Sequence, residues 1–164
     1  MEEGILVSNV KNVQAAVAYH AGNVNVDELP WVPYFGDAKF KLLKANPVTG
    51  QNITLLYVPA KMQLPAHFHP GQVIVYTVQG SWRYLEESWI SKPGDMVFEP
   101  AGSTHTPTAV GDEDVITFNI VEGTLDYLGE NGEIIARDNW ESFLKRYLDY
   151  CEAEGIEPVD VTAF

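Results

Sequence analysis

Cysteine, long apolar runs and positive charge are all scarce in this sequence of 164 residues. The single cysteine, Cys151, excludes disulfides within the chain and fits a reducing compartment. No stretch of about 18 apolar residues is present, so the sequence predicts no membrane-spanning helix. Ten Lys and Arg residues stand against 23 Asp and Glu residues, and the net charge is −13. We therefore expect no nucleic-acid partner and no anionic membrane surface, because phosphate binding relies on Lys and Arg.

The beginning of the sequence carries no export signal. Residues 1–4 are acidic and lack the basic segment that opens a secretory signal, so a cytoplasmic protein is expected. The length and the 46% content of hydrophobic residues predict one globular domain, residues 1–164, with a sizeable core.

Short strand-like segments follow one another through the middle of the chain. Gly, Pro and Asn turns separate them, and they recur about every 8 to 12 residues, as in β-sandwiches and small barrels. We expect a β-barrel over about residues 29–136, after an N-terminal arm of about residues 1–28. The predicted strands are 38–45, 53–59, 63–69, 72–78, 82–85, a short one at 88–91, 96–99, 105–110 and 115–121.

The sequence after the last of these strands has a different pattern. Asn131-Gly132 predicts a two-residue hairpin turn. Asp138, with Glu141 three residues later, predicts a capping box that starts a helix over about residues 138–155, and Gly155 predicts its C-cap. We expect this helix to pack outside the barrel or in a subunit contact, with its cysteine as a core residue and not a nucleophile. Its apolar face consists of Trp140, Phe143, Leu144, Tyr147, Leu148 and Cys151.

Three histidines carry the chemical signal of the sequence. His67 and His69 are two residues apart on a predicted strand, so both imidazoles project from the same face. His105 follows a Pro-x-Gly turn, and a β-barrel can bring it across to the first pair. Three converging imidazoles predict a metal site, although a histidine in a barrel can also be a hydrogen-bonded core residue. His20 has no second candidate ligand nearby, and we expect it in a loop or on the surface.

The spacing around these histidines resembles the two motifs of the cupin superfamily. The first motif, H-x-H-x3-E-x6-G, is matched by His67, His69 and Gly80, with Val73 in the place of the glutamate. The second, G-x5-P-x-G-x2-H-x3-N, is matched by Gly94, Pro100, Gly102 and His105, with Ala109 in the place of the asparagine. The resemblance implies an all-β fold, a single cupin barrel (double-stranded β-helix or jelly-roll) with the C-terminal α-helix packed outside.

The missing motif glutamate has chemical consequences. Three neutral imidazoles leave a divalent ion with its full charge, so the site would favour a ligand that brings negative charge, such as an enolate. If Val73 points inward, Val75 and Thr77 follow it by strand alternation and predict a largely apolar cavity. Such a cavity suits an aromatic or alkyl ketone better than a sugar. Residues 82–84 (Trp-Arg-Tyr) are candidates for its rim or wall.

Glu99 is the second residue of interest. Strand alternation puts it on the same face as Val97, where it would line the barrel interior. A carboxylate there could accept an imidazole N–H, fix its tautomer or help to deprotonate a substrate. The competing interpretation is a solvent-facing carboxylate at a strand end. The diketone-cleaving dioxygenases that the chain resembles carry a glutamate at this place, which implies a catalytic role for Glu99.

A closer resemblance covers most of the chain. Segments 27–33 and 127–156, together with the two motifs, look like the 2,4'-dihydroxyacetophenone dioxygenase family, which is grouped with the cupin domain of zinc-binding anti-sigma factors. The resemblance implies an Fe(II) site at His67, His69 and His105. It also implies that O2 cleaves a C–C bond in a hydroxyketone or diketone.

Other metals and functions stay open at this point. Neutral imidazoles also accept Zn, Mn and Ni. A metal-binding sensor or regulatory module, like the anti-sigma cupins, is one alternative function, and an isomerase or lyase that acts without O2 is another. By analogy with similar cupins, we expect a homodimer or homotetramer.

Overall fold

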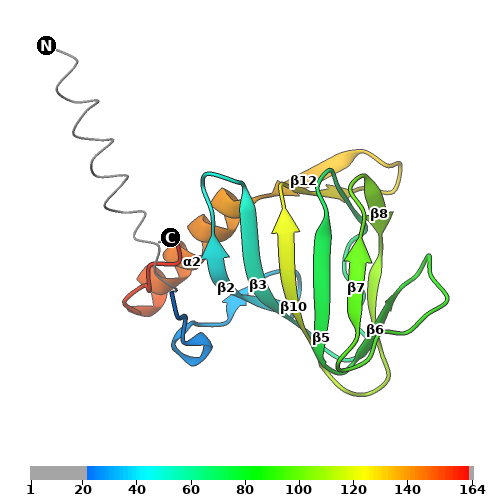
Figure 1. Ribbon diagram of the computed structural model, residues 1–164, viewed down its shortest axis with the longest axis horizontal. Coiled ribbons are helices and arrows are strands. Elements are labelled where there is room, and N and C mark those ends of the chain that lie inside the picture. The colour runs from blue at the N-terminus through cyan, green and yellow to red at the C-terminus, as the bar shows by residue number, and fades with distance from the viewer. Residues whose placement is uncertain (1–21, 163–164) are drawn as a thin grey trace, which may run out of the picture.

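The computed structural model describes residues 22–162, and most of them lie in β-strands (Figure 1). A six-stranded antiparallel sheet forms the larger layer. Its order is β1 (Val32–Pro33), β2 (Lys39–Ala45), β3 (Gln51–Val58), β10 (Val115–Glu122), β5 (Val73–Gln79) and β7 (Met96–Glu99).

Two smaller sheets close the barrel against the larger one. The four-stranded sheet has the order β12 (Ile134–Asp138), β11 (Leu125–Leu128), β4 (His67–His69) and β8 (Ser103–His105). A two-stranded sheet pairs β6 (Ser81–Tyr84) with β9 (Pro107–Val110). A short 3-10 turn, η1 (Val26–Glu28), and helix α2 (Trp140–Glu154) complete the described residues. The predicted all-β barrel with a C-terminal helix is therefore confirmed.

Alternation along the strands explains why one face of the large sheet is buried. On β10, every second residue is buried, beginning with Val115, which is the pattern of a strand with one face toward a core. On β5, Val73, Val75 and Thr77 are buried, whereas Tyr76 is exposed. Val73 thus points inward, and Val75 and Thr77 follow it, as strand alternation predicts.

Helix α2 covers the β1–β2 side of the large sheet, away from β7 (Figure 1). Its buried residues pack with residues of β1 and β2 in a second apolar cluster, separate from the barrel core. Cys151 is 1% exposed in this cluster, as expected of a core residue, and burial raises the pKa of its thiol. The cluster contains Leu29, Val32, Phe40, Leu42, Ala45, Phe143, Tyr147, Cys151 and Val161.

The start of helix α2 differs from the prediction. Asn139, and not Asp138, is the N-cap, and its capping box is formed with Ser142 instead of Glu141. Asp138 is unavailable because it still belongs to β12, where it pairs with Leu125. Gly155 is the C-cap in the left-handed conformation, with φ 66°, as predicted.

The last hairpin also differs from the prediction. Asn131-Gly132 does not form a two-residue turn, because β11 ends at Leu128 and β12 begins only at Ile134. The amide of Gly129 donates to the carbonyl of Glu133 at 2.8 Å, so the connection spans residues 129–133. The Glu133 carboxylate accepts the amide of Asn131 at 3.0 Å and stabilises this longer loop.

Three further expectations concern the edges of the barrel. The predicted strand 63–69 is shorter in the structure, since only β4 is continuous and Gln63 makes an isolated bridge to Thr108. The short strand predicted at 88–91 does not form, and Ser91 makes only an isolated bridge to Trp82. The expected N-terminal arm lies mostly outside the described residues, and so does His20. Within residues 22–162, no helix is long and apolar enough to cross a membrane.

Candidate metal centre

Strand β4 brings the three histidines together. It pairs antiparallel with β8 in a register that sets His67 directly opposite His105 and His69 opposite Ser103. Ring centroids are 6.0 Å apart for His67 and His69, 6.3 Å for His67 and His105, and 5.3 Å for His69 and His105. The expected approach of the three imidazoles is therefore present in the fold.

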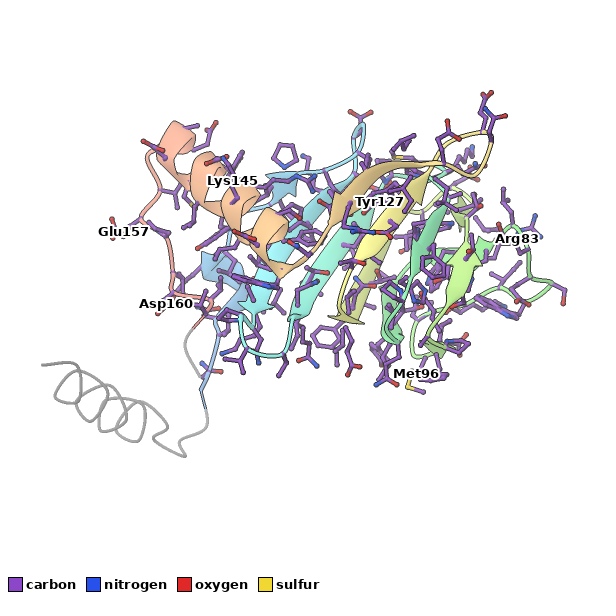
Figure 2. All side chains as sticks on the ribbon, turned by 90° about the horizontal axis from the view of Figure 1, so that it is seen from above. Arg83, Met96, Tyr127, Lys145, Glu157 and Asp160 are labelled. Carbon is purple, nitrogen blue, oxygen red and sulfur yellow. The ribbon has the colours of Figure 1, made fainter. Side chains whose placement is uncertain are left out.

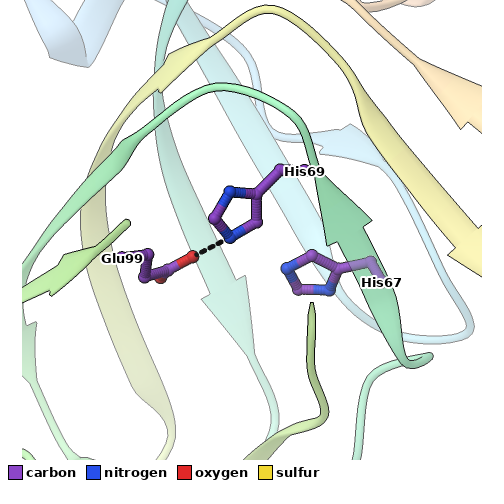
Figure 3. Close-up of side chains that lie close together, drawn as sticks. All are labelled: His67, His69 and Glu99. Carbon is purple, nitrogen blue, oxygen red and sulfur yellow. Dashed lines mark ion pairs between the residues drawn. The ribbon is translucent and has the colours of Figure 1, made fainter. Parts of the chain in front are cut away.

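Glu99 reaches the same place from the end of β7 in the other sheet. Its side chain is buried, and its Oε2 lies 2.8 Å from His69 Nε2 (Figure 3) and 3.8 Å from His105 Nε2. The Tyr84 hydroxyl donates a hydrogen bond to the other carboxylate oxygen. The solvent-facing interpretation of Glu99 is excluded by its 2% exposure.

These side chains offer donors of the types that transition metals prefer. One donor atom each from His67, His69 and Glu99 lies within 4.8 Å of the others, and His105 stands beside this group. The carboxylate comes from β7 and not from the motif position on β5, where the residue is Val73. Imidazole and carboxylate donors together fit Fe, Zn, Mn or Ni, so the residues present fit a divalent metal.

The turn after β4 fixes the orientation of His69. Its Nδ1 donates to the Gly71 carbonyl at 2.7 Å, which directs Nε2 toward Glu99. A side chain at position 71 would collide with the backbone of Glu122, so the turn requires glycine for close approach. His67 Nδ1 lies 3.4 Å from the Pro65 carbonyl, a weaker version of the same arrangement.

Burial and hydrogen bonding shift the pKa values of Glu99 and His69 in opposite directions. Burial alone would raise the pKa of the Glu99 carboxyl, but the hydrogen bonds from His69 and Tyr84 hold it below its usual range. Burial would lower the pKa of His69, but the hydrogen bond to Glu99 and that to the Gly71 carbonyl raise it. Each residue thus favours the charged form of the other.

The other two histidines are favoured as neutral imidazoles. Burial lowers the pKa of His67, and it does the same for His105. The nearby Glu99 carboxylate opposes this effect in both cases without reversing it. Neutral imidazole is the form that binds metal ions.

Aromatic side chains form one wall beside the histidines. The Tyr84 ring stacks on His105 with centroids 4.3 Å apart and an interplanar angle of 20°. Trp82 and Trp89 pack edge-on against Tyr84, and Trp82 Nε1 donates to the Thr77 hydroxyl at 2.8 Å. Trp82 and Tyr84 are thus wall residues, as the sequence suggested, whereas Arg83 between them lies at the end of the molecule away from α2 (Figure 2).

A largely apolar cavity adjoins the centre, as Val73 and its neighbours predicted. His67 and Glu99 form part of its wall, and most of the remaining wall is aliphatic or aromatic. The contribution of Tyr34, Tyr127 and Phe143 could not be predicted from the sequence, because these residues enter from the segment after β1, from β11 and from α2. The polar residues in the wall are Asn52, Thr54, Thr108, Thr117 and Asn119.

Comparisons with known proteins agree with this fold. Residues 20–126 match the family model of the ChrR cupin-like domain. An RmlC-like cupin protein of Ralstonia eutropha JMP134 is 46% identical, with a TM-score of 0.84 over 88% of this chain and 96% of that one. No curated protein matches the chain.

More distant structures share the fold. The acetylacetone dioxygenase of Acinetobacter johnsonii is 18% identical, with a TM-score of 0.69 over 81% of this chain and 93% of that one. The complex of Rhodobacter sphaeroides SigE with the anti-sigma ChrR gives 22% identity and a TM-score of 0.52 over 60% of this chain and 51% of that one. The motifs, the barrel and the family model lead to one conclusion: the chain belongs to the family of ChrR cupin-like domains.

Proposed function

We propose that this protein is an Fe(II)-dependent dioxygenase that cleaves a C–C bond in a hydroxyketone or diketone, of the kind represented by 2,4'-dihydroxyacetophenone. The observation that carries the proposal is the group of His67, His69, His105 and Glu99, in which His69 and Glu99 are buried and His67 and Glu99 line an apolar cavity. The fold shared with an acetylacetone dioxygenase supports it.

In this proposal the three histidines hold the metal. When bound, Fe(II) would supply Lewis acidity toward the two oxygens of a chelating ketone and one-electron chemistry toward dioxygen. Zn, Mn and Ni fit the same donors, and the metal content of the purified protein decides among them.

Glu99 acts as the base that accepts a proton from the substrate. Its Oε2 faces the histidines, and the low pKa of its carboxyl keeps it ionised near neutral pH. Tyr84 holds the other oxygen of the carboxylate and so positions Oε2. The apolar wall around the group excludes water from the proton transfer.

The test begins with anaerobic Fe(II) loading of the full chain and a measurement of bound metal. Oxygen consumption is then followed with 2,4'-dihydroxyacetophenone and with acetylacetone. We expect iron-dependent oxygen uptake. The His105→Ala substitution should lower this uptake by about 100-fold or more, and the variant should also bind less metal. His20→Ala is the control, because the sequence predicts no ligand role for this residue. Uptake that is equal in wild type and His105→Ala would contradict the proposal.

A metal-responsive regulatory module is the second candidate function. The family model and the shared fold with the anti-sigma ChrR favour it. Tight zinc binding without oxygen uptake across the ketone panel would support this function, and ketone turnover without oxygen uptake would indicate an isomerase or lyase instead.

We also propose a cytoplasmic homodimer or homotetramer, by analogy with similar cupins. Light scattering of the full chain measures the mass directly, and a mass of 18.3 kDa would contradict an oligomer.

A further inference from the structure

Asn52 is a polar side chain without a partner in the wall of the cavity. It is fully buried on β3, and neither its amide nitrogen nor its amide oxygen has a hydrogen-bond partner among the described residues. A buried unsatisfied polar group costs about 1–3 kcal/mol, so a structural role does not explain it. Asn119, the other asparagine of the wall, differs because its amide bonds to the hydroxyl and the carbonyl of Thr117.

The sheet register places Asn52 in the same row as Glu99. Asn52 pairs with Val121 on β10, Val121 pairs with Val73 on β5, and Val73 pairs with Glu99 on β7. All four side chains are buried and line the cavity. Three strand spacings separate the two ends of the row, about 14 Å along the curved sheet. Asn52 therefore lies across an apolar span from the metal centre.

The surroundings of Asn52 restrict the chemistry of a ligand group there. An amide offers two N–H donors and one carbonyl acceptor, so a hydroxyl group, which donates and accepts, satisfies both of its sides. A carboxylate would bring a charge that nothing compensates, since no Lys or Arg is among the described residues that line the cavity. Thr108, whose hydroxyl also has no partner in the part of the chain that the structure describes, contributes a second neutral polar group to the wall.

We propose that Asn52 is a specificity-determining residue, whose amide binds a neutral hydroxyl at the end of the substrate remote from the metal centre. The substrate class is then an aromatic or alkyl ketone with two polar ends, one at the histidines and one at Asn52. This inference rests on the proposed function. It also explains why an unsatisfied amide is retained, because the ligand supplies the missing hydrogen bonds.

The experiment compares two ligands and two proteins. 2,4'-Dihydroxyacetophenone carries a ring hydroxyl remote from its hydroxyketone, and 2-hydroxyacetophenone lacks it. Calorimetry under anaerobic conditions measures the binding of each compound to the zinc-loaded full chain, and kcat/KM is measured with the iron-loaded chain. We expect wild type to prefer the dihydroxy compound at least tenfold and Asn52→Leu to lower this preference to nearly one.

Thermal stability gives an independent test of the role of Asn52. Because the Asn52 amide has no partner within residues 22–162, Asn52→Leu should leave the Tm of the ligand-free chain unchanged or raise it. The control Asn119→Leu removes a partnered amide, so it should lower the Tm and keep the ligand preference. If Asn52→Leu fails to fold, Asn52→Ala tests the same amide with a smaller side chain.

A ligand preference that survives in the folded Asn52 variants would overturn the inference. Failure of the proposed function gives a different result, because the wild-type protein would then consume no oxygen with either compound. Calorimetry would still report whether the binding of the two compounds differs through Asn52.

Discussion

Val73 and Glu99 lie directly opposite each other on neighbouring strands β5 and β7, and both side chains are buried against the cavity. Val73 occupies the place where the first cupin motif has its glutamate. The carboxylate therefore enters the centre from the next strand, one strand spacing away. Tyr84 and His69 both hydrogen-bond to this carboxylate. Its position is therefore set by contacts inside the barrel and not by the strand position at which the motif has its glutamate.

This relationship predicts the behaviour of Val73→Glu. A second carboxylate beside Glu99 adds a like charge in a buried place, so we expect the metal-free variant to lose about 3 kcal/mol of unfolding free energy. A divalent ion offsets that repulsion, so zinc should raise the Tm of the variant more than that of wild type. Val75→Glu, two residues along the same face, is the control, and zinc rescue of both variants alike would contradict the prediction. Thermal unfolding with and without zinc measures these effects.

Tyr84 acts on the centre through its hydroxyl and its ring, and two variants separate these parts. Tyr84→Phe removes the hydrogen bond to Glu99 and keeps a ring that can stack on His105. We expect it to cost about 2 kcal/mol of stability and about tenfold in zinc affinity. Tyr84→Leu also loses the ring, so its zinc affinity should fall further. Competition titration with a zinc-binding dye measures both, and wild-type affinity in Tyr84→Phe would show that the hydroxyl does not position Glu99.

Asp138 connects the last strand to helix α2. Its buried carboxylate accepts hydrogen bonds from Ser142 at 2.8 Å, Arg146 at 3.0 Å and Tyr34 at 3.2 Å. Asp138→Ala leaves these donors without an acceptor, and we expect a loss of about 2 kcal/mol in urea unfolding. Asn139→Ala removes only the helix cap and should cost about 1 kcal/mol. A larger loss for Asn139→Ala than for Asp138→Ala would contradict this order.

The pair of Asp126 and Arg137 predicts a dependence of stability on pH. Hydrogen bonds from Arg137, at 2.5 Å and 2.7 Å, lower the pKa of the Asp126 carboxyl in the folded protein. A folded-state pKa below the unfolded value, about 3.9, adds stability above that pH and loses it as pH falls through the folded pKa. We expect Asp126→Asn to have a lower Tm than wild type at pH 7 and to approach the wild-type Tm as the pH falls below the unfolded value toward the folded pKa. A Tm difference that is constant across this range would count against the pair.

Much of the candidate metal centre could be predicted from the sequence. Strand alternation and motif spacing are local properties, and they place His67, His69 and His105 on facing strands and turn Val73 inward. The hydrogen bond between Tyr84 and Glu99 could not be predicted in this way. Their strands, β6 and β7, belong to different sheets, and the contact forms only when the barrel closes.

The start of helix α2 shows a second reason why the sequence does not predict every feature of the structure. Asp138 and Asn139 are both good N-cap residues and are adjacent, so local preference does not choose between them. The strand pairing of Asp138 with Leu125 decides the matter, and that pairing depends on the length of the hairpin loop. Sequence patterns thus predict the elements, whereas competition between neighbouring elements sets their ends.

Gly71 has a consequence for how the sequence can vary. It offers the centre no side chain, yet its carbonyl orients His69, and the backbone of Glu122 leaves room only for a hydrogen atom at its Cα. In a saturation-mutagenesis screen for metal retention, we expect position 71 to be as intolerant of substitution as the histidines themselves. Pro70, exposed in the same turn, should accept several residues. We therefore expect steric fit to limit substitution in this part of the chain as strictly as ligand chemistry does.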